Sequence, residues 1–168
     1  RAEEQELAAA ARSSGVEDFA AEAPGEPLEA DRVPFAFSFL PFLSSAGPGR
    51  HEYTVALNLL VGGSYAIRGM ELAFILNITE HQVLGYQSAA VGNILNGRLA
   101  GAQSAGVFNI VGGETRAGQW AGVFNIVQGN ASFFQGAGVF NINAGEFRGL
   151  QGAGVFNIGR GGVFGVQG

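Results

Sequence analysis

Cysteine and lysine are both absent from this 168-residue chain, and only two histidines and one methionine occur. Without cysteine there is no disulfide framework, no thiolate metal site and no cysteine nucleophile. No run of about 18 apolar residues occurs either, so the sequence does not predict a membrane-spanning helix.

Basic residues are too few and too scattered for a nucleic-acid partner, which would need a basic patch. Residues 33–168 carry five acids and six arginines, so this part of the chain is nearly neutral. The acidic excess lies in residues 1–32, with nine acids and three arginines. We interpret residues 1–32 as an Ala/Glu-rich arm, helical at first and then a linker. Such an arm is either a solvated leader or docks on a neighbouring subunit.

Glycine (28 residues) and phenylalanine (14 residues) are abundant, which fits neither a disordered chain nor collagen. Phe35, Phe37 and Phe39 alternate with smaller residues, a period of two that predicts a strand. A second alternating segment covers residues 53–59. We expect this strand pair, within residues 33–68, to cap a repeat array, because terminal units of repeat proteins are atypical.

Residues 69–168 repeat with a period of 16, and five positions recur in successive copies. They form columns of Ala (Ala73 to Ala153), Ile (Ile78 to Ile158) and Gly (Gly97 to Gly161). The Asn column is Asn77, Asn93, Asn109, Asn125, Asn141 and Asn157. The Gln column is Gln87, Gln103, Gln119, Gln135, Gln151 and Gln167, with Glu71 at the same place in the first copy.

A 16-residue unit is too short for two packed helices, and its glycines would destabilise a helix. The sequence therefore predicts an all-β, parallel β-solenoid with 16-residue coils. Alternation places Gln, Ala, Val and Asn on one inward face, and each residue stacks on its own copy at about 4.8 Å. Stacked Asn and Gln amides can bond to one another in ladders. We expect the Ile after Asn to turn inward and the recurring glycine to form a corner with positive φ.

A second column, of phenylalanine, should point away from this inward face: Phe108, Phe124, Phe140 and Phe156. We call it the Phe ladder. One interpretation is that residues 33–43 of the same chain cover it. The other, which we prefer, is that it forms a contact surface between chains, because aligned exposed aromatics exceed what a soluble monomer usually leaves bare.

The units Gly101-Ala-Gln-Ser-Ala-Gly-Val-Phe-Asn-Ile110 and Gly149-Leu-Gln-Gly-Ala-Gly-Val-Phe-Asn-Ile158 resemble those of a bacterial surface-repeat family. Its tandem units have the form G-x-Q-x-A-G-[VL]-x-N-[IV], and the non-repeat segment from Val33 is also similar. The resemblance covers residues 33–168 and implies an exported or surface-exposed protein; it transfers no catalytic residue. Phe before Asn, where the family commonly has an aliphatic residue, is a departure.

No catalytic, cofactor or metal site is expected. His51 follows the first strand in a loop, where we expect it to be solvated, and His81 lies in the first irregular repeat. The carboxylates of residues 33–168 are dispersed, and surface ion pairs would explain them. Glu71 should accept a hydrogen bond from Gln87. No nucleophile, base and orienting group can be assembled.

We therefore expect a non-enzymatic structural protein, extracellular or on the bacterial cell surface. Its subunits would associate through the Phe ladder and through an open last coil at Gly165–Gly168, stacking head to tail into a fibre. The alternative is a glycan- or ice-binding, adhesin-like module. The alternative is weaker because the outer columns hold Gly and Phe and no threonine or tyrosine ladder.

Overall fold

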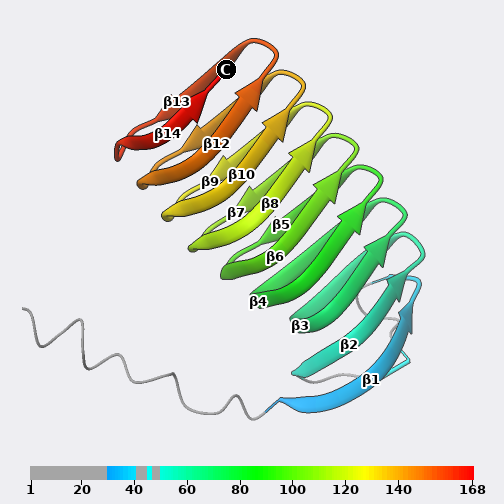
Figure 1. Cartoon of the computed structure of the whole chain (residues 1–168). Helices are drawn as coiled ribbons and strands as arrows, with labels where there is room; N and C mark the ends of the chain where they lie inside the picture. The colour runs from blue at the N-terminus through cyan, green and yellow to red at the C-terminus, as the bar shows by residue number, and fades with distance from the viewer. Residues whose placement is uncertain (1–29, 41–44, 47–49) are drawn as a thin grey trace, which may run out of the picture.

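The computed structural model describes residues 30–40, 45–46 and 50–168, and within these it is all-β. The predicted helix of the acidic arm lies outside the described residues. The coils stack one behind another from the β1 end to the β14 end (Figure 1). Their bounds are β1 (Asp31–Ser38), β2 (His51–Asn58), β3 (Val61–Ala73), β4 (Leu76–Ala89), β5 (Gly92–Leu95), β6 (Arg98–Ala105), β7 (Phe108–Val111), β8 (Thr115–Ala121), β9 (Phe124–Val127), β10 (Ala131–Ala137), β11 (Phe140–Asn143), β12 (Phe147–Ala153), β13 (Phe156–Gly159) and β14 (Val163–Gln167).

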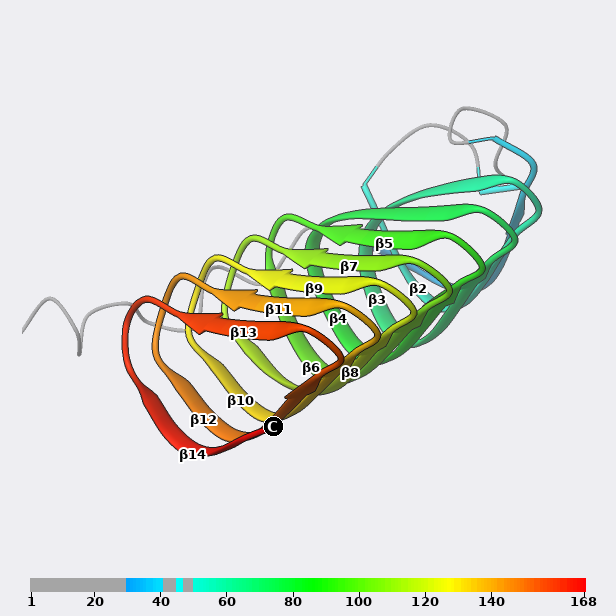
Figure 2. The ribbon, with the colours of Figure 1, turned by 90° about the horizontal axis from the view of Figure 1, so that it is seen from above.

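Each coil consists of a short strand, a bend and a longer strand, and Figure 2 shows the two kinds of strand in two separate rows. The short row contains β5, β7, β9, β11 and β13, and the long row contains β6, β8, β10, β12 and β14. β3 and β4 contribute to both rows: they pair with each other along both halves, and the first half of β4 then pairs with β5 and its second half with β6. The chain therefore winds as a solenoid with two walls.

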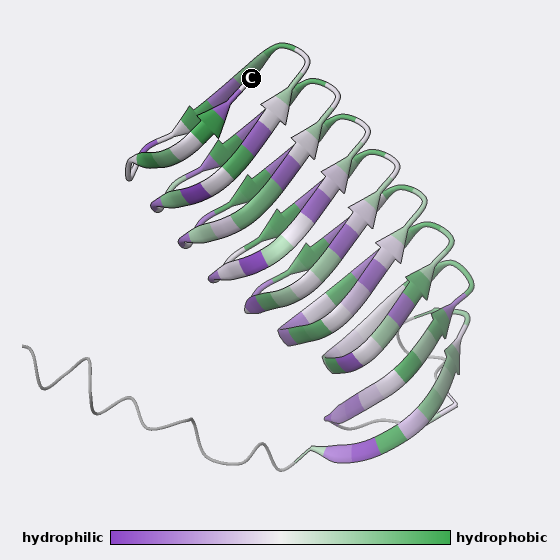
Figure 3. Ribbon diagram, in the orientation of Figure 1, coloured by the Kyte–Doolittle hydropathy of each residue, from purple (hydrophilic) through white to green (hydrophobic). Residues whose placement is uncertain are grey.

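All neighbouring strands are parallel, and like residues face like residues. Asn93 pairs with Asn109, and Gln103 with Gln119, each 16 residues along the chain. The predicted parallel β-solenoid with 16-residue coils is thus confirmed. Figure 3 shows the same hydrophilic band recurring along successive long strands.

At the N-terminal end, β1 and β2 extend the long row only. β1 pairs with β2, which pairs with the second half of β3. Phe35, Phe37 and Phe39 remain about half exposed there. The interpretation that this segment covers the Phe ladder is therefore wrong for its described residues, because backbone pairing with β2 holds β1 in the opposite wall. Residues 41–43 of that segment lie outside the described residues.

The space between the walls is filled by apolar side chains from the start of each long strand and the end of each short strand. Representative members are Val83, Leu99, Val111, Val127 and Phe147, each at most 1% exposed. Burying an aliphatic or aromatic side chain of this size stabilises the fold by about 1.5–3 kcal/mol. The amide columns lie beside this apolar core, so the interior is half apolar and half hydrogen-bonded.

Three expectations about the coil were wrong. The Val column does not point inward with Gln and Asn, because its members lie in the bend, where they are half-buried or, at Val155, 69% exposed. Ile110 is not turned inward: it is half-buried like Phe108, while Asn109 and Val111 are buried. The reason is that β7 stays extended for four residues, so strict alternation places both Phe and Ile outside.

The recurring glycines from Gly97 to Gly161 do not have positive φ. They are needed instead because a Cβ at Gly113 or Gly129 would collide with the backbone of the preceding coil. Positive φ occurs in another column, within the long strands, at Gly69, Gly85, Gly101, Gly149 and Gly165.

Candidate functional site

The Asn column forms a continuous hydrogen-bonded ladder inside the solenoid. Asn109 Nδ2 donates to Asn125 Oδ1 at 2.9 Å, and Asn125 Nδ2 donates to Asn141 Oδ1 at 2.8 Å. The second N–H of each Nδ2 group donates to a backbone carbonyl in the long wall, as Asn125 does to Gly136 at 2.9 Å. Each interior amide thus satisfies its donors while fixing both walls of the coil. The bonded members are Asn77, Asn93, Asn109, Asn125, Asn141 and Asn157.

The Gln column forms a second ladder that runs in the opposite direction. Gln119 Nε2 donates back to Gln103 Oε1 at 3.0 Å, whereas Asn donors point forward to the next coil. The series ends at Glu71, whose Oε2 accepts from Gln87 Nε2 at 2.7 Å, as the sequence predicted. A carboxylate accepts and does not donate, so it is a natural end for a chain of donors that all point one way. The donors are Gln87, Gln103, Gln119, Gln135, Gln151 and Gln167.

Glu71 is fully buried and has no cation beside it among the described residues. Four donors converge on its carboxylate: Asn58 Nδ2 (3.1 Å), Ser64 Oγ (2.6 Å), Thr79 Oγ1 (3.0 Å) and Gln87 Nε2 (2.7 Å). Burial raises the pKa of Glu71 above its usual range, while these hydrogen bonds lower it and offset part of the effect. Glu71 thus has the structural role in the Gln ladder that the sequence predicted.

Sequence reasoning missed how the Asn ladder begins. Asn58 lies on β2, in the long wall, yet its Nδ2 donates to Asn77 Oδ1 at 3.0 Å. Its side chain occupies the space above Gly62, where a Cβ would overlap it. Ser38 Oγ donates in turn to Asn58 Oδ1. The spacing from Asn58 to Asn77 is 19 residues, so the 16-residue period does not reveal it; Gly62-Gly63 was the only signal.

The Phe ladder is a stack of parallel rings along the outer face of the short wall. Neighbouring ring centroids lie 5.0–5.5 Å apart, from Phe108 through Phe124 and Phe140 to Phe156. The first three rings are half-buried against one another and Phe156 is 42% exposed. Ring stacking therefore already removes much of this surface from solvent.

The more exposed aromatic surface lies on the opposite wall. Trp120 on β8 and Phe134 on β10 pack against each other with ring centroids 5.3 Å apart. Phe133 is 70% exposed and Leu150 54% exposed beside them. Phe133 has φ of +103°, the only non-glycine residue with positive φ in the described chain, and it occupies the glycine column of the long strands. A bulky residue in this region carries a backbone strain of about 1–3 kcal/mol.

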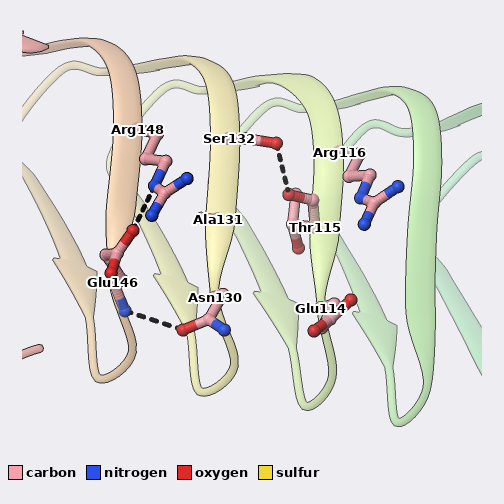
Figure 4. A pocket seen from close by; sticks show the side chains of 8 residues that line it. All are labelled: Glu114, Thr115, Arg116, Asn130, Ala131, Ser132, Glu146 and Arg148. Carbon is pink, nitrogen blue, oxygen red and sulfur yellow. Dashed lines mark hydrogen bonds and ion pairs between the residues drawn. The ribbon is translucent and has the colours of Figure 1, made fainter. Parts of the chain in front are cut away.

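A shallow groove of about 380 Å³ lies where the chain enters β8, β10 and β12 (Figure 4). Glu114, Asn130 and Glu146 line one side in successive coils. Arg116 and Arg148 line the other, and Arg148 Nε donates to Glu146. The groove thus presents charges of both signs at a regular spacing.

No family model matches the chain, and no curated protein and no solved structure matches it either. The resemblance to a bacterial surface-repeat family stays a prediction from the residues.

The remaining titratable groups do not assemble into a reactive cluster in the part of the chain that the structure describes. His51 is not solvated as expected: it begins β2 and is buried, with no hydrogen-bond partner on either ring nitrogen. His81 stacks on Tyr65 at 5.5 Å. Glu52, also buried, pairs with Arg68 at 2.7 Å. No metal-binding group of His, Asp and Glu occurs among the described residues, nor does any helix that could cross a bilayer.

Proposed function

We propose that this protein is a non-enzymatic structural module of the bacterial cell surface or extracellular space, whose subunits associate into a filament. The observation that carries the proposal is the pair of amide ladders, which run in register through the repeats. Interior donors on every coil are used along the stack axis, which favours a stiff rod. A rod with the same side chains in every coil suits a structural role, in which one surface is presented repeatedly, better than it suits catalysis.

Two further features support association. Both outer walls carry exposed apolar side chains, among them Phe156 on the short wall and Phe133 on the long wall. Among the described strands, β13 and β14 stand at the ends of the strand order, and no further described strand pairs with their outer edges. Such edges pair readily with an added strand.

Sedimentation velocity and electron microscopy of the purified chain test this function. The expected result is a population of species larger than a monomer that grows with concentration, with rods of uniform width on the grid. A protein that remains a compact monomer at high concentration in both measurements would refute self-association.

A glycan-binding surface is the second candidate, favoured by the exposure of Tyr86 and Trp120 on the flat long wall. Amphipathic aromatic rings of this kind combine an apolar face with a polar handle. A glycan array distinguishes the glycan-binding function from the structural one. Selective binding that is lost in Trp120→Ser would favour the glycan function, and no signal would remove it.

A further inference from the structure

The outer face of the long wall carries a continuous apolar patch near its C-terminal end, which we call the aromatic patch. It consists of Trp120, Phe133, Phe134, Leu150 and Val166, on β8, β10, β12 and β14, where Trp120 packs on Phe134 and the register continues from Phe134 through Leu150 to Val166. Four of the five are 46–70% exposed. Figure 3 shows hydrophobic segments on these strands of the long wall. The patch is distinct from the Phe ladder, which lies on the opposite wall.

Phe133 is the residue that the fold alone does not explain. In its column, five other coils have glycine with positive φ, and the coil before it has a buried Ala117. Phe133 keeps the strained glycine conformation yet leaves 70% of its surface exposed, so it gains little from packing within the monomer. Strained residues of this kind cluster at sites of ligand or partner contact. The ring is held outward where a second surface can cover it.

The size of the patch indicates a protein partner. A large aromatic or aliphatic side chain has about 200 Å² of surface, so five that are roughly half exposed present about 500 Å² of apolar surface. This lies in the upper range for a monomer, about 300–600 Å², and such patches are often functional. With its polar rim, the face approaches the roughly 800 Å² that each partner buries in a standard interface.

The charges at the rim favour a second copy of the chain as that partner. Arg116 and Arg148 stand beside the patch, and Glu114 and Glu146 stand two residues before them in the same coils. A rim that carries both signs can pair with itself, because Arg116 of one copy can meet Glu114 of the other, while Arg148 already donates to Glu146 within its own chain. A two-fold interface requires this kind of self-complementary surface. A purely acidic or purely basic partner would leave half of these charges opposed.

We infer that the aromatic patch is a homotypic interface through which two solenoids pair wall to wall. This inference rests on the proposed self-association and specifies the surface that performs it. It assigns the lateral contact to the long wall instead of the Phe ladder. The open strand edges are left for growth along the axis.

The test is sedimentation equilibrium of the full chain for the wild type, Phe133→Gly and Leu150→Ser, with Phe124→Leu in the Phe ladder as the matched control. We expect both patch variants to weaken lateral pairing at least tenfold while keeping the wild-type circular dichroism spectrum. Leu150→Ser leaves the positive-φ column untouched, so it tests the surface even where Phe133→Gly perturbs folding. We expect Phe124→Leu to pair like the wild type.

The possible outcomes separate this inference from the proposed function. Assembly that persists in both patch variants but weakens in Phe124→Leu would overturn the inference and leave self-association standing. A wild type that is monomeric at every concentration would overturn both. Binding of vesicles or glycans by a monomeric wild type would assign the aromatic patch to another partner and likewise overturn the inference.

Discussion

Replacing Asn125 with leucine tests whether the Asn ladder stabilises the solenoid. Leucine has the same number of side-chain heavy atoms and the same branch point as asparagine, but its methyl groups are bulkier and neither donate nor accept. Asn125 is fully buried, accepts from Asn109 Nδ2 at 2.9 Å and donates to Asn141 Oδ1 at 2.8 Å and to the Gly136 carbonyl at 2.9 Å. The substitution therefore leaves one N–H of Asn109 and the Oδ1 of Asn141 without their ladder partners inside the protein.

Each buried polar group that loses its partner costs about 1–3 kcal/mol, so two such groups predict a loss of about 2–6 kcal/mol in the free energy of unfolding. Urea unfolding followed by far-ultraviolet circular dichroism measures this loss. Because repeat proteins can unfold in parts, hydrogen exchange of the β9 and β11 amides should report the same loss locally.

Asn157→Leu is the matched control, since Asn157 belongs to the same column but is only partly buried. Water can replace its bonds, so we expect a cost below about 1 kcal/mol. A smaller loss of stability for Asn125→Leu than for Asn157→Leu, or a stability of Asn125→Leu equal to that of the wild type, would show that the Asn ladder does not stabilise the solenoid.

Three further substitutions test other parts of the structure. Burial raises the pKa of the Glu71 carboxyl above its ordinary value of 4.5, so the folded chain binds the carboxyl proton more tightly than the unfolded chain. The free energy of unfolding should therefore fall as the pH rises from below 4.5 through the raised pKa of the folded state. Glu71→Gln should remove this part of the pH dependence, which amounts to about 1.4 kcal/mol for each unit by which the pKa differs between the folded and unfolded states. Parallel profiles of urea midpoint against pH for the wild type and the variant would contradict this. Gly138→Ala should lower the free energy of unfolding by about 1–3 kcal/mol, because the added Cβ would collide with the Gly122 carbonyl. Gly152→Ala is the control and should not destabilise, because nothing lies within 4 Å of its added Cβ. Equal melting temperatures for the two variants would contradict the close stacking of the bends. Phe133→Gly relieves about 1–3 kcal/mol of strain but loses some packing and adds chain entropy, so its free energy of unfolding should stay within about 1 kcal/mol of the wild type; a loss of several kcal/mol would show that the ring supports the monomer.

The repeated columns were predictable from the sequence because identical residues at one period must meet if the coils stack in parallel. Asn109 and Asn125, or Gln103 and Gln119, need only that argument to be placed together. The orientation of Ile110 was not predictable with the same ease. It depends on where the bend falls, and the bend precedes Phe108 instead of following Asn109.

The non-repeating residues were harder because their roles depend on shape in three dimensions. Asn58 joins the ladder from the other wall only because Gly62 leaves room for its side chain. Phe133 appears in the sequence as one more aromatic residue, and the dihedral angle shows that it keeps the positive-φ conformation of the glycines in its column. The signal available in the sequence was that Phe133 falls in the same column of the repeat as Gly101.

The opposite directions of the two ladders determine which coil can extend the stack. At the β13 and β14 end, Asn157 Nδ2 uses one N–H on the Gly168 carbonyl and has a second to donate. Gln167 Nε2 donates back to Gln151, which leaves its Oε1 as an acceptor facing onward. An added coil must therefore offer an acceptor in the Asn column and a donor in the Gln column. An asparagine and a glutamine in the register of this repeat supply both, whereas a carboxylate in the Gln column, such as Glu71, would place oxygen against oxygen. A coil added at this end therefore continues both ladders only if it carries both amides. A second copy of this chain presents β1 and β2 ahead of its Glu71 coil, so head-to-tail addition of a copy would pair strand edges and extend neither ladder.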